Sequence, residues 1–190
     1  MKKQIKAVFG ILSFVVLLGA AFFAYNTLSD NTDISENIIG NIVGAENIVS
    51  DMQRAPDFAM EDAMGNEVRL SDFLGQPVVL NFWATWCPNC VLETPYFEAL
   101  YQEMGGDVQI LKVNLIGSRG ETRSAVNSFM DTGNYTLPLY FDIYGDGAQA
   151  FSIRFIPATF FITPEGYIAS NVQGAINETT LRNGIDMITE

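Results

Sequence analysis

The pattern of apolar and polar positions predicts the elements of this chain before any single residue is considered. Short apolar runs of strand length alternate with segments in which apolar residues recur every three or four positions, as they do in helices. The predicted strands are 57–60, 67–70, 78–83, 108–115, 139–142, 158–162 and 167–172. The predicted helices are one turn capped by Ser71, 88–104, 121–131, one or two turns at 147–152, and a last helix capped by Asn177.

This order of elements predicts an α/β domain over residues 55–190. A hairpin, then alternating strands and helices, then a second hairpin and a helix indicate a mixed central sheet flanked by helices, with an N-terminal β-hairpin extension. Strand 78–83 is almost continuously apolar, so we expect it to be central and covered on both faces. The stripe expected to be buried on helix 88–104 is Leu92, Tyr96, Phe97, Leu100 and Tyr101. The residues expected to be buried on the last helix are Leu181, Ile185 and Ile188.

A longer apolar run, residues 7–25, precedes the domain and has the length of a membrane span. Its 19 uncharged residues would extend roughly 28 Å as a helix, about the thickness of the hydrocarbon core. Three lysines lie within the first six residues, so the positive-inside rule places the domain on the extracytoplasmic side. We interpret residues 1–28 as a transmembrane signal anchor and 29–54 as an extracytoplasmic linker. A signal peptide cleaved near residues 19–21 is the alternative.

The charge balance and the lack of histidine exclude several kinds of function. The chain has ten Lys and Arg against 22 Asp and Glu, for a formal net charge of −12. Nucleic acids and anionic lipid surfaces need clustered basic charge, so neither is expected as a partner. Without histidine there is no Cys-His or Ser-His nucleophile, and two cysteines are too few for a closed zinc site. We therefore expect neither a metal nor another cofactor.

The two cysteines, Cys87 and Cys90, lie where strand 78–83 gives way to helix 88–104. At a helix N-terminus, the unpaired N–H groups and the positive end of the helix dipole favour a thiolate. We therefore expect Cys87 to be the more acidic and more exposed thiol, and Cys90, one turn further on, to be more buried. A purely structural disulfide is the alternative, but closing so short a loop adds little stability.

Two segments carry a family resemblance. They are Phe82-Trp83-Ala84-Thr85-Trp86-Cys87-Pro88-Asn89-Cys90-Val91-Leu92-Glu93-Thr94-Pro95 and Phe155-Ile156-Pro157-Ala158-Thr159-Phe160-Phe161-Ile162, the second followed by Pro164-Glu165-Gly166. With them, residues 55–188 resemble the membrane-anchored TlpA/ResA-like thiol-disulfide oxidoreductases of the thioredoxin superfamily. The resemblance implies a thioredoxin-like fold and a redox-active disulfide between Cys87 and Cys90. It also implies that Pro157 has a cis peptide bond and that Ile156 faces the substrate.

The resemblance further suggests how the dithiol works. Cys87 would attack a partner and form a mixed disulfide, and Cys90 would then attack Cys87 and release the partner. Thioredoxin has a buried Asp in the strand before its dithiol, where this chain has Asn81, which does not titrate. We interpret Glu93, which matches a Glu of the TlpA/ResA-like pattern, as the acceptor of the Cys90 proton. An exposed acid on the helix surface is the alternative. Trp86 is expected to shield the dithiol or to contact the partner.

The predicted function is therefore the reduction of specific extracytoplasmic protein disulfides, for example those of apocytochrome c or another exported protein. The resemblance implies an integral-membrane thiol carrier as the electron donor, and we expect a monomer anchored by residues 7–25. Two alternatives stay open. One is a disulfide-forming oxidase, and the other is a non-catalytic thioredoxin-like binding module that holds a partner near Trp86 and Pro157.

Overall fold

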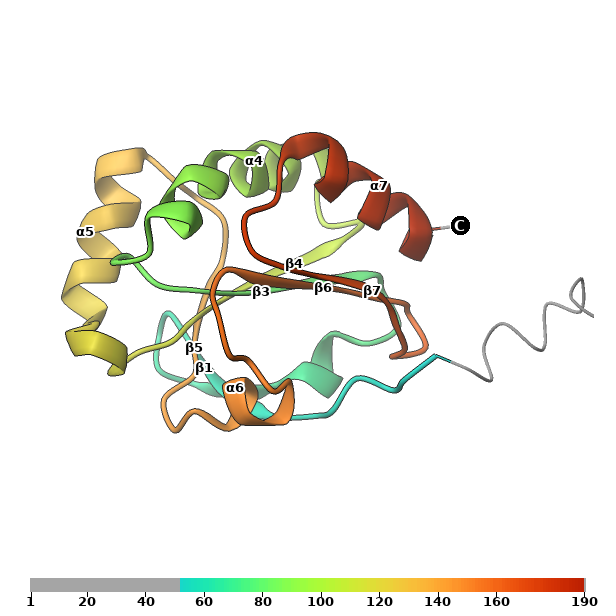
Figure 1. Cartoon of the computed structure of the whole chain (residues 1–190), viewed down its shortest axis with the longest axis horizontal. Coiled ribbons are helices and arrows are strands. Elements are labelled where there is room, and N and C mark those ends of the chain that lie inside the picture. Colours follow the sequence, from blue (N-terminus) through green and yellow to red (C-terminus); the bar gives the residue numbers. More distant parts are fainter. Residues whose placement is uncertain (1–51, 190) are drawn as a thin grey trace, which may run out of the picture. The chain divides into compact units, whose positions relative to one another are not determined.

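A computed structural model describes residues 52–189 of the 190-residue chain, and these residues form a seven-stranded sheet with helices on both faces (Figure 1). The order of strands across the sheet is β2-β1-β5-β4-β3-β6-β7. The strands are β1 (Ala59–Asp62), β2 (Glu67–Arg69), β3 (Val78–Trp83), β4 (Gln109–Asn114), β5 (Leu139–Phe141), β6 (Ala158–Ile162) and β7 (Ile168–Gln173).

The sheet is mixed, as the order of elements predicts. Strand β3 pairs in parallel with β4 and antiparallel with β6, and β4 pairs in parallel with β5. All six residues of β3 are buried, which confirms it as a central strand. The hairpin β1–β2 continues the sheet beyond β5, so the predicted N-terminal extension is also confirmed.

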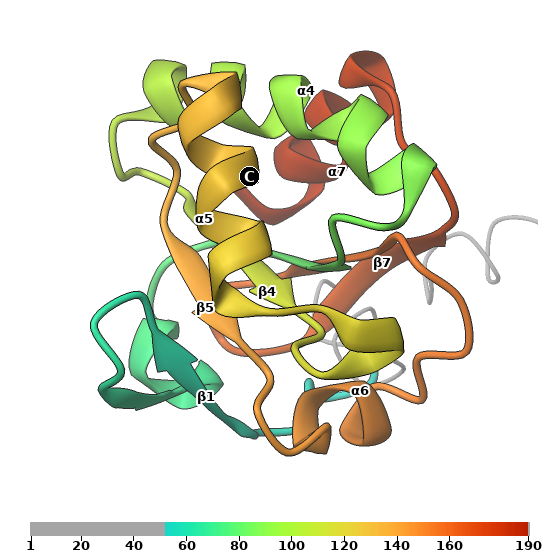
Figure 2. The same ribbon diagram turned by 90° about the vertical axis from the view of Figure 1, so that its left-hand side faces the viewer.

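Three longer helices cover one face of the sheet and two short ones cover the other (Figures 1 and 2). The first face carries α4 (Pro88–Met104), α5 (Arg123–Gly133) and α7 (Glu178–Thr189), and the second carries η3 (Leu70–Phe73) and α6 (Asp146–Ala150). Side chains of β3 alternate between the two cores: Val79 and Trp83 pack on the α4 side, and Leu80 and Phe82 on the other. Asn81 therefore points toward α4.

The predicted stripe on α4 is wrong at two positions. Leu92 is 69% exposed and Tyr96 is 37% exposed. The buried residues of α4 are Cys90, Glu93, Thr94, Phe97 and Leu100. Glu93 and Thr94 are polar, so a prediction from apolar side chains alone leaves them out. The predicted stripe is therefore shifted toward the solvent-exposed side of the helix.

Some predicted element ends also differ from the structure. Helix η3 is capped at Arg69, not at Ser71, and the Asp72 carboxylate accepts the N–H of Arg69 at 2.8 Å. The N–H of Ser71 lies inside the helix and donates to the Asp57 carboxylate at 3.0 Å. Helix α5 begins two residues later than expected, with Thr122 as its cap. A short 3-10 helix, η4 (Ser118–Gly120), precedes α5 and is not predicted. The cap of α7 is confirmed, since Asn177 Oδ1 accepts the N–H of Thr180 at 2.8 Å.

The predicted anchor, 7–25, lies outside the described residues, as does most of the predicted linker. Within residues 52–189, no helix combines the length and the apolar character that crossing a membrane requires. The backbone already pairs with the domain at its first described residues: Gln53 accepts the N–H of Ile168 at 2.8 Å, and Ala55 donates to Gly166 at 2.9 Å.

Candidate active site

The dithiol lies at the junction between β3 and α4. Cys87 is the N-cap of α4, and Pro88 occupies the first helical position. The two cysteines form a disulfide with their Cα atoms 5.3 Å apart. The N–H of Cys90 points at Cys87 Sγ from 3.3 Å, so the helix end offers this sulfur a donor that would stabilise a thiolate. Cys87 keeps 5% of its surface exposed and Cys90 none, in the predicted order.

The Ile156–Pro157 segment closes over the disulfide. The peptide bond between these two residues is cis, as the family resemblance implies. The carbonyl oxygen of Ile156 lies 3.6 Å from Cys87 Sγ, although the two residues are 69 positions apart in the sequence. The structure thus brings Cys87, Ile156 and Pro157 together at one edge of the dithiol.

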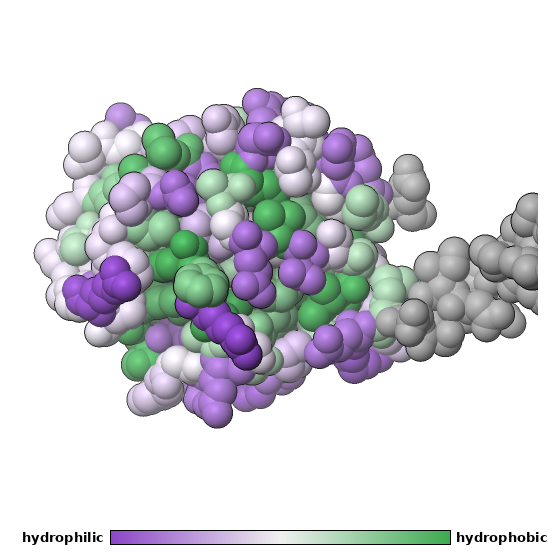
Figure 3. Space-filling view, in the orientation of Figure 1, coloured by the Kyte–Doolittle hydropathy of each residue, from purple (hydrophilic) through white to green (hydrophobic). Residues whose placement is uncertain are grey.

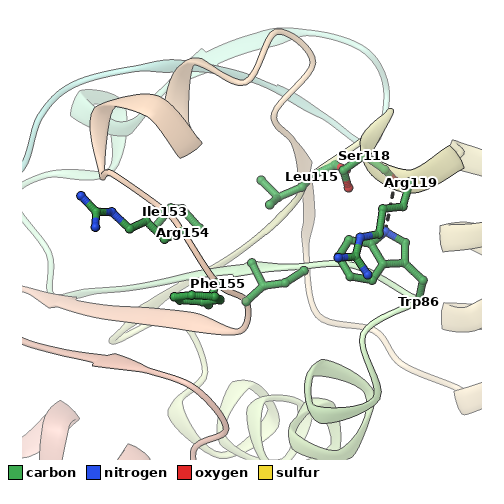
Figure 4. Close-up of a pocket in the computed structure, with 8 residues that line it drawn as sticks. Trp86, Leu115, Ser118, Arg119, Ile153, Arg154 and Phe155 are labelled. Carbon is green, nitrogen blue, oxygen red and sulfur yellow. Dashed lines mark hydrogen bonds between the residues drawn. The ribbon is translucent and has the colours of Figure 1, made fainter.

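Trp86, the residue before the dithiol, is held against the 3-10 helix η4. Its indole Nε1 donates to the carbonyl oxygen of Ser118 at 3.1 Å, and the guanidinium of Arg119 lies 4.5 Å from the ring centroid (Figure 4). This cation–π contact fixes the plane of the ring beside Ile156, with which Trp86 shares a groove.

Glu121 supports the loop before Cys87 and was not expected to do so. Its side chain is 4% exposed. One carboxylate oxygen accepts the N–H of Thr85 at 3.1 Å and the other accepts the Thr85 hydroxyl at 2.9 Å. Asn114 donates to the same carboxylate at 3.2 Å. From the sequence, Glu121 is simply an acid at the start of the next helix.

Behind the dithiol, three neighbouring strands contribute one polar residue each at the same level of the sheet. Asn81 of β3 is in register with Lys112 of β4 and with Thr159 of β6. All three are fully buried. Their side chains face α4, and Asn81 Nδ2 donates to Thr159 Oγ1 at 3.0 Å. We call these three residues the buried polar row.

Glu93 lies over the buried polar row and is itself only 1% exposed. Its Oε1 accepts from Asn81 Nδ2 at 3.0 Å, and its Oε2 accepts the N–H of Ile176, just before α7, at 3.1 Å. Burial raises the pKa of Glu93 above its ordinary value, while the charge of Lys112 and the two hydrogen bonds oppose that rise. The alternative of an exposed acid at this position is therefore wrong.

Lys112 is a functional candidate that the sequence patterns do not predict. Its ammonium donates to Thr94 Oγ1 at 3.3 Å and lies 4.5 Å from the Phe97 ring centroid and 4.9 Å from that of Trp83. Burial lowers the pKa of Lys112 to about 7, against the opposing attraction of Glu93. A signal was available, because Lys112 is the single charged residue within the predicted strand 108–115.

Comparisons with known proteins show the family to which the chain belongs. The model of the AhpC/TSA family matches residues 52–171, more than half of the chain. The chain belongs to the AhpC/TSA family.

Relatives of this AhpC/TSA-family chain are named for disulfide chemistry. It is 32% identical over 152 residues to the thiol-disulfide oxidoreductase ResA of Bacillus subtilis, covering 80% of this chain and 83% of that protein. It is 31% identical to ResA of Geobacillus kaustophilus, over 99% of both chains. Among solved structures, StoA from B. subtilis matches with a TM-score of 0.60 and 27% identity, over 68% of this chain and 96% of that one.

These findings make the AhpC/TSA-family chain a protein-disulfide oxidoreductase with a thioredoxin-like fold. They confirm the resemblance to ResA-like proteins. The individual roles of Cys87, Cys90, Glu93 and the residues around them stay predictions, which the geometry above makes specific.

Asn81→Asp in this AhpC/TSA-family protein should destabilise the fold, and increasingly so at higher pH. The new carboxyl would be buried against Glu93 Oε1, so its pKa in the folded state would rise above its unfolded value. Stability is then lost as the pH rises above the ordinary carboxyl range of about 4. We expect a loss of about 3 kcal/mol at pH 8 and a smaller one at pH 5, measured by urea unfolding.

The double variant Asn81→Asp/Glu93→Gln exchanges the acid and the amide and serves as the control. It keeps one carboxyl in the pair and should recover most of the lost stability. An Asn81→Asp loss that is the same at both pH values would contradict the burial of two interacting acids.

Proposed function

We propose that this protein is an extracytoplasmic reductant that breaks disulfide bonds in specific protein substrates through Cys87 and Cys90. One observation carries the proposal: Cys87 caps α4 and lies against the Ile156 carbonyl, while the buried Glu93 lies one turn beyond Cys90 on the same helix. In this proposal, an attacking sulfur, a contact segment for the partner and a proton acceptor are arranged around one dithiol.

In the proposed reaction, the Cys87 thiolate attacks one sulfur of the substrate disulfide. A mixed disulfide forms, and the first substrate sulfur leaves as a thiolate. Cys90 then gives its proton to the Glu93 carboxylate and attacks Cys87 Sγ, which expels the second substrate thiolate. The protein dithiol is oxidised to the disulfide by two electrons and the substrate disulfide is reduced to two thiols. Trp86, Ile156 and Pro157 would contact the substrate chain during the attack.

The proposed location follows from the sequence. The apolar segment 7–25, with lysines before it, would anchor the protein in the membrane and place the domain outside. Disulfides persist there, so a reductant has substrates such as apocytochrome c or another exported protein. An integral-membrane thiol carrier would return the protein to its dithiol form by donating two electrons.

Lys112 would set the protonation state of Glu93. Its charge lowers the pKa of the carboxyl, which keeps a fraction of Glu93 ionised and ready to take a proton despite its burial. Lys112 also reaches the dithiol helix through hydrogen bonds, since Thr94 accepts from Lys112 and donates to the carbonyl oxygen of Cys90 at 2.8 Å. We assign Lys112 as a positioning residue that acts through Glu93.

The direction of electron flow is tested by the reduction potential. The protein would be equilibrated in glutathione buffers and its dithiol fraction measured by thiol alkylation. A reductant should have a potential below that of the glutathione pool, which is about −220 to −260 mV. A value near −120 mV, about that of a strong oxidant, would instead support a disulfide-forming oxidase.

Cys90→Ser should trap the substrate, because the variant forms the mixed disulfide and lacks the sulfur that resolves it. The prereduced variant should attack an insulin disulfide and stay linked to one insulin chain, which a non-reducing gel detects as a covalent adduct. Insulin-reducing turnover should fall by at least about 100-fold. The matched variant Cys87→Ser should give neither adduct nor turnover. Adduct formation by Cys87→Ser and not by Cys90→Ser would reverse the two roles.

Glu93→Gln should slow the resolution step by about 100-fold at neutral pH, since an amide does not accept the Cys90 proton.

Lys112→Met should shift the pH dependence of resolution to higher pH. Without the ammonium, the pKa of Glu93 rises further, so the carboxyl stays protonated and idle over a wider range. Single-turnover release of a mixed disulfide, followed from pH 5 to pH 9, measures both effects.

Lys112→Met in the Glu93→Gln background provides the control. If Lys112 acts through Glu93, the double variant should have the same pH profile as Glu93→Gln alone. A purely structural role would change melting temperature without moving the profile, and an unmoved profile in Lys112→Met would reject the assignment.

A further inference from the structure

A groove of about 340 Å³ opens beside the dithiol. Trp86 and Arg119 lie at one end of it, and Arg154 and Phe155 at the other (Figure 4). Ile156 also lines the groove, and its carbonyl oxygen is the atom that lies 3.6 Å from Cys87 Sγ. A polypeptide that presents a disulfide to Cys87 therefore has this groove next to its cysteine.

The groove offers an apolar surface with a charged group at each end. Phe155 is 72% exposed, which is unusual for a large aromatic side chain in a soluble domain. Trp86, Ile153 and Leu115 add further apolar surface. The face of the domain drawn in Figure 3 likewise has apolar surface next to strongly hydrophilic groups. Such a groove fits an extended segment with one apolar side chain and charged neighbours.

The two arginines of the groove differ from most of the other basic residues of the domain, which are ion-paired or buried. The seven basic residues after the N-terminal lysines are Arg54, Arg69, Lys112, Arg119, Arg123, Arg154 and Arg182. Arg69, Arg123 and Arg182 form ion pairs with carboxylates. Lys112 is buried beside Glu93 and Arg54 stacks on Tyr167.

Within residues 52–189, neither Arg119 nor Arg154 has a carboxylate within 4 Å, and both are exposed. Arg119 also has a left-handed backbone (φ 47°), which is uncommon for a residue with a side chain and holds its guanidinium over Trp86. The chain has 22 acids against ten bases. Two basic groups without carboxylate partners among the described residues thus flank a groove that adjoins the reactive sulfur.

We propose that the groove selects protein substrates in which acidic residues flank the target cysteine. Arg119 and Arg154 would bind the carboxylates, and Phe155 and Trp86 would contact an apolar side chain between them. This inference rests on the proposed function and adds the class of substrate to it. Since both arginines are exposed, their contribution is mainly to the rate of encounter and to its salt dependence.

Three synthetic peptides test the proposal. Each carries the same disulfide loop and one aromatic residue, with glutamate, glutamine or lysine on both sides of the reactive cysteine. The second-order rate constants for their reduction by the prereduced full-length protein are measured by stopped flow at low salt and at 1 M salt. We expect the glutamate peptide to react about tenfold faster than the lysine peptide at low salt, and the ratio to approach one at 1 M salt.

The net charge of −12 lets the peptides distinguish a local positive site from the charge of the whole protein. The field of the whole protein attracts the lysine peptide more strongly than the glutamate peptide. Only a local positive site reverses that preference. In Arg119→Gln/Arg154→Gln, the glutamate-to-lysine ratio should fall to one or below. Arg54→Gln removes the same charge at a residue that also lacks an ion pair, and the ratio should stay as in the wild type.

The outcomes separate the inference from the function on which it rests. Two results would overturn the acidic-substrate proposal: equal rates for the lysine and glutamate peptides with the wild type, or a glutamate preference that survives in the double variant. The groove would then bind another occupant, such as a second copy of the chain. Neutral dipyridyl disulfide reports the thiol chemistry by itself. If the wild type reduces dipyridyl disulfide and all three peptides at equal rates, the groove proposal fails alone. If it reduces neither dipyridyl disulfide nor any peptide, the proposed function fails as well.

Discussion

The structure depends on the burial of one carboxyl group, that of Glu93, between the dithiol helix and the sheet. Taking a carboxylate out of water costs several kcal/mol unless partners compensate it. Here the partners come from three separate elements: the Asn81 amide of β3, the Ile176 N–H before α7, and the Lys112 ammonium of β4. The three partners must be in place at the same time. Glu93, the proposed proton acceptor, therefore also fixes how α4 and α7 pack on the sheet.

The same helix carries the sulfurs and the acid, so their relative placement does not depend on a flexible loop. Cys87 caps α4, and Cys90, Glu93 and Thr94 follow on its buried side. The approach to Cys87 is fixed separately, by Glu121 holding Thr85 and by Ile156 lying against the sulfur. Because the Cys87 sulfur and the segment beside it are already oriented, forming a mixed disulfide would require little rearrangement of the protein.

Sequence patterns predict the fold and the dithiol well because each is marked locally. Strand β6 and helix α4 have the predicted bounds, since Pro and Gly residues delimit both segments. Lys112 escapes this reasoning because its partners lie on another strand and on a helix, and only the register of β3 with β4 and β6 aligns the buried polar row. Leu92 was misplaced for the same reason: the polar row draws Glu93 and Thr94 inward, which no apolar count anticipates.

Asn81 adds a hydrogen-bond donor, and no further charge, to the buried pair of Lys112 and Glu93. Lys112 carries a positive charge below its pKa of about 7. Burial leaves the pKa of the Glu93 carboxyl raised, although Lys112 and the two hydrogen bonds oppose the rise. A second acid at position 81, as in thioredoxin, would place two carboxyls within hydrogen-bonding distance of each other and hold at least one of them protonated. An amide at that position donates to Glu93 without competing for a proton. In the proposed reaction, the carboxyl of Glu93 would then gain and lose one proton per catalytic cycle, and the charge of Lys112, which lowers the pKa of Glu93, would shift the pH range in which it does so.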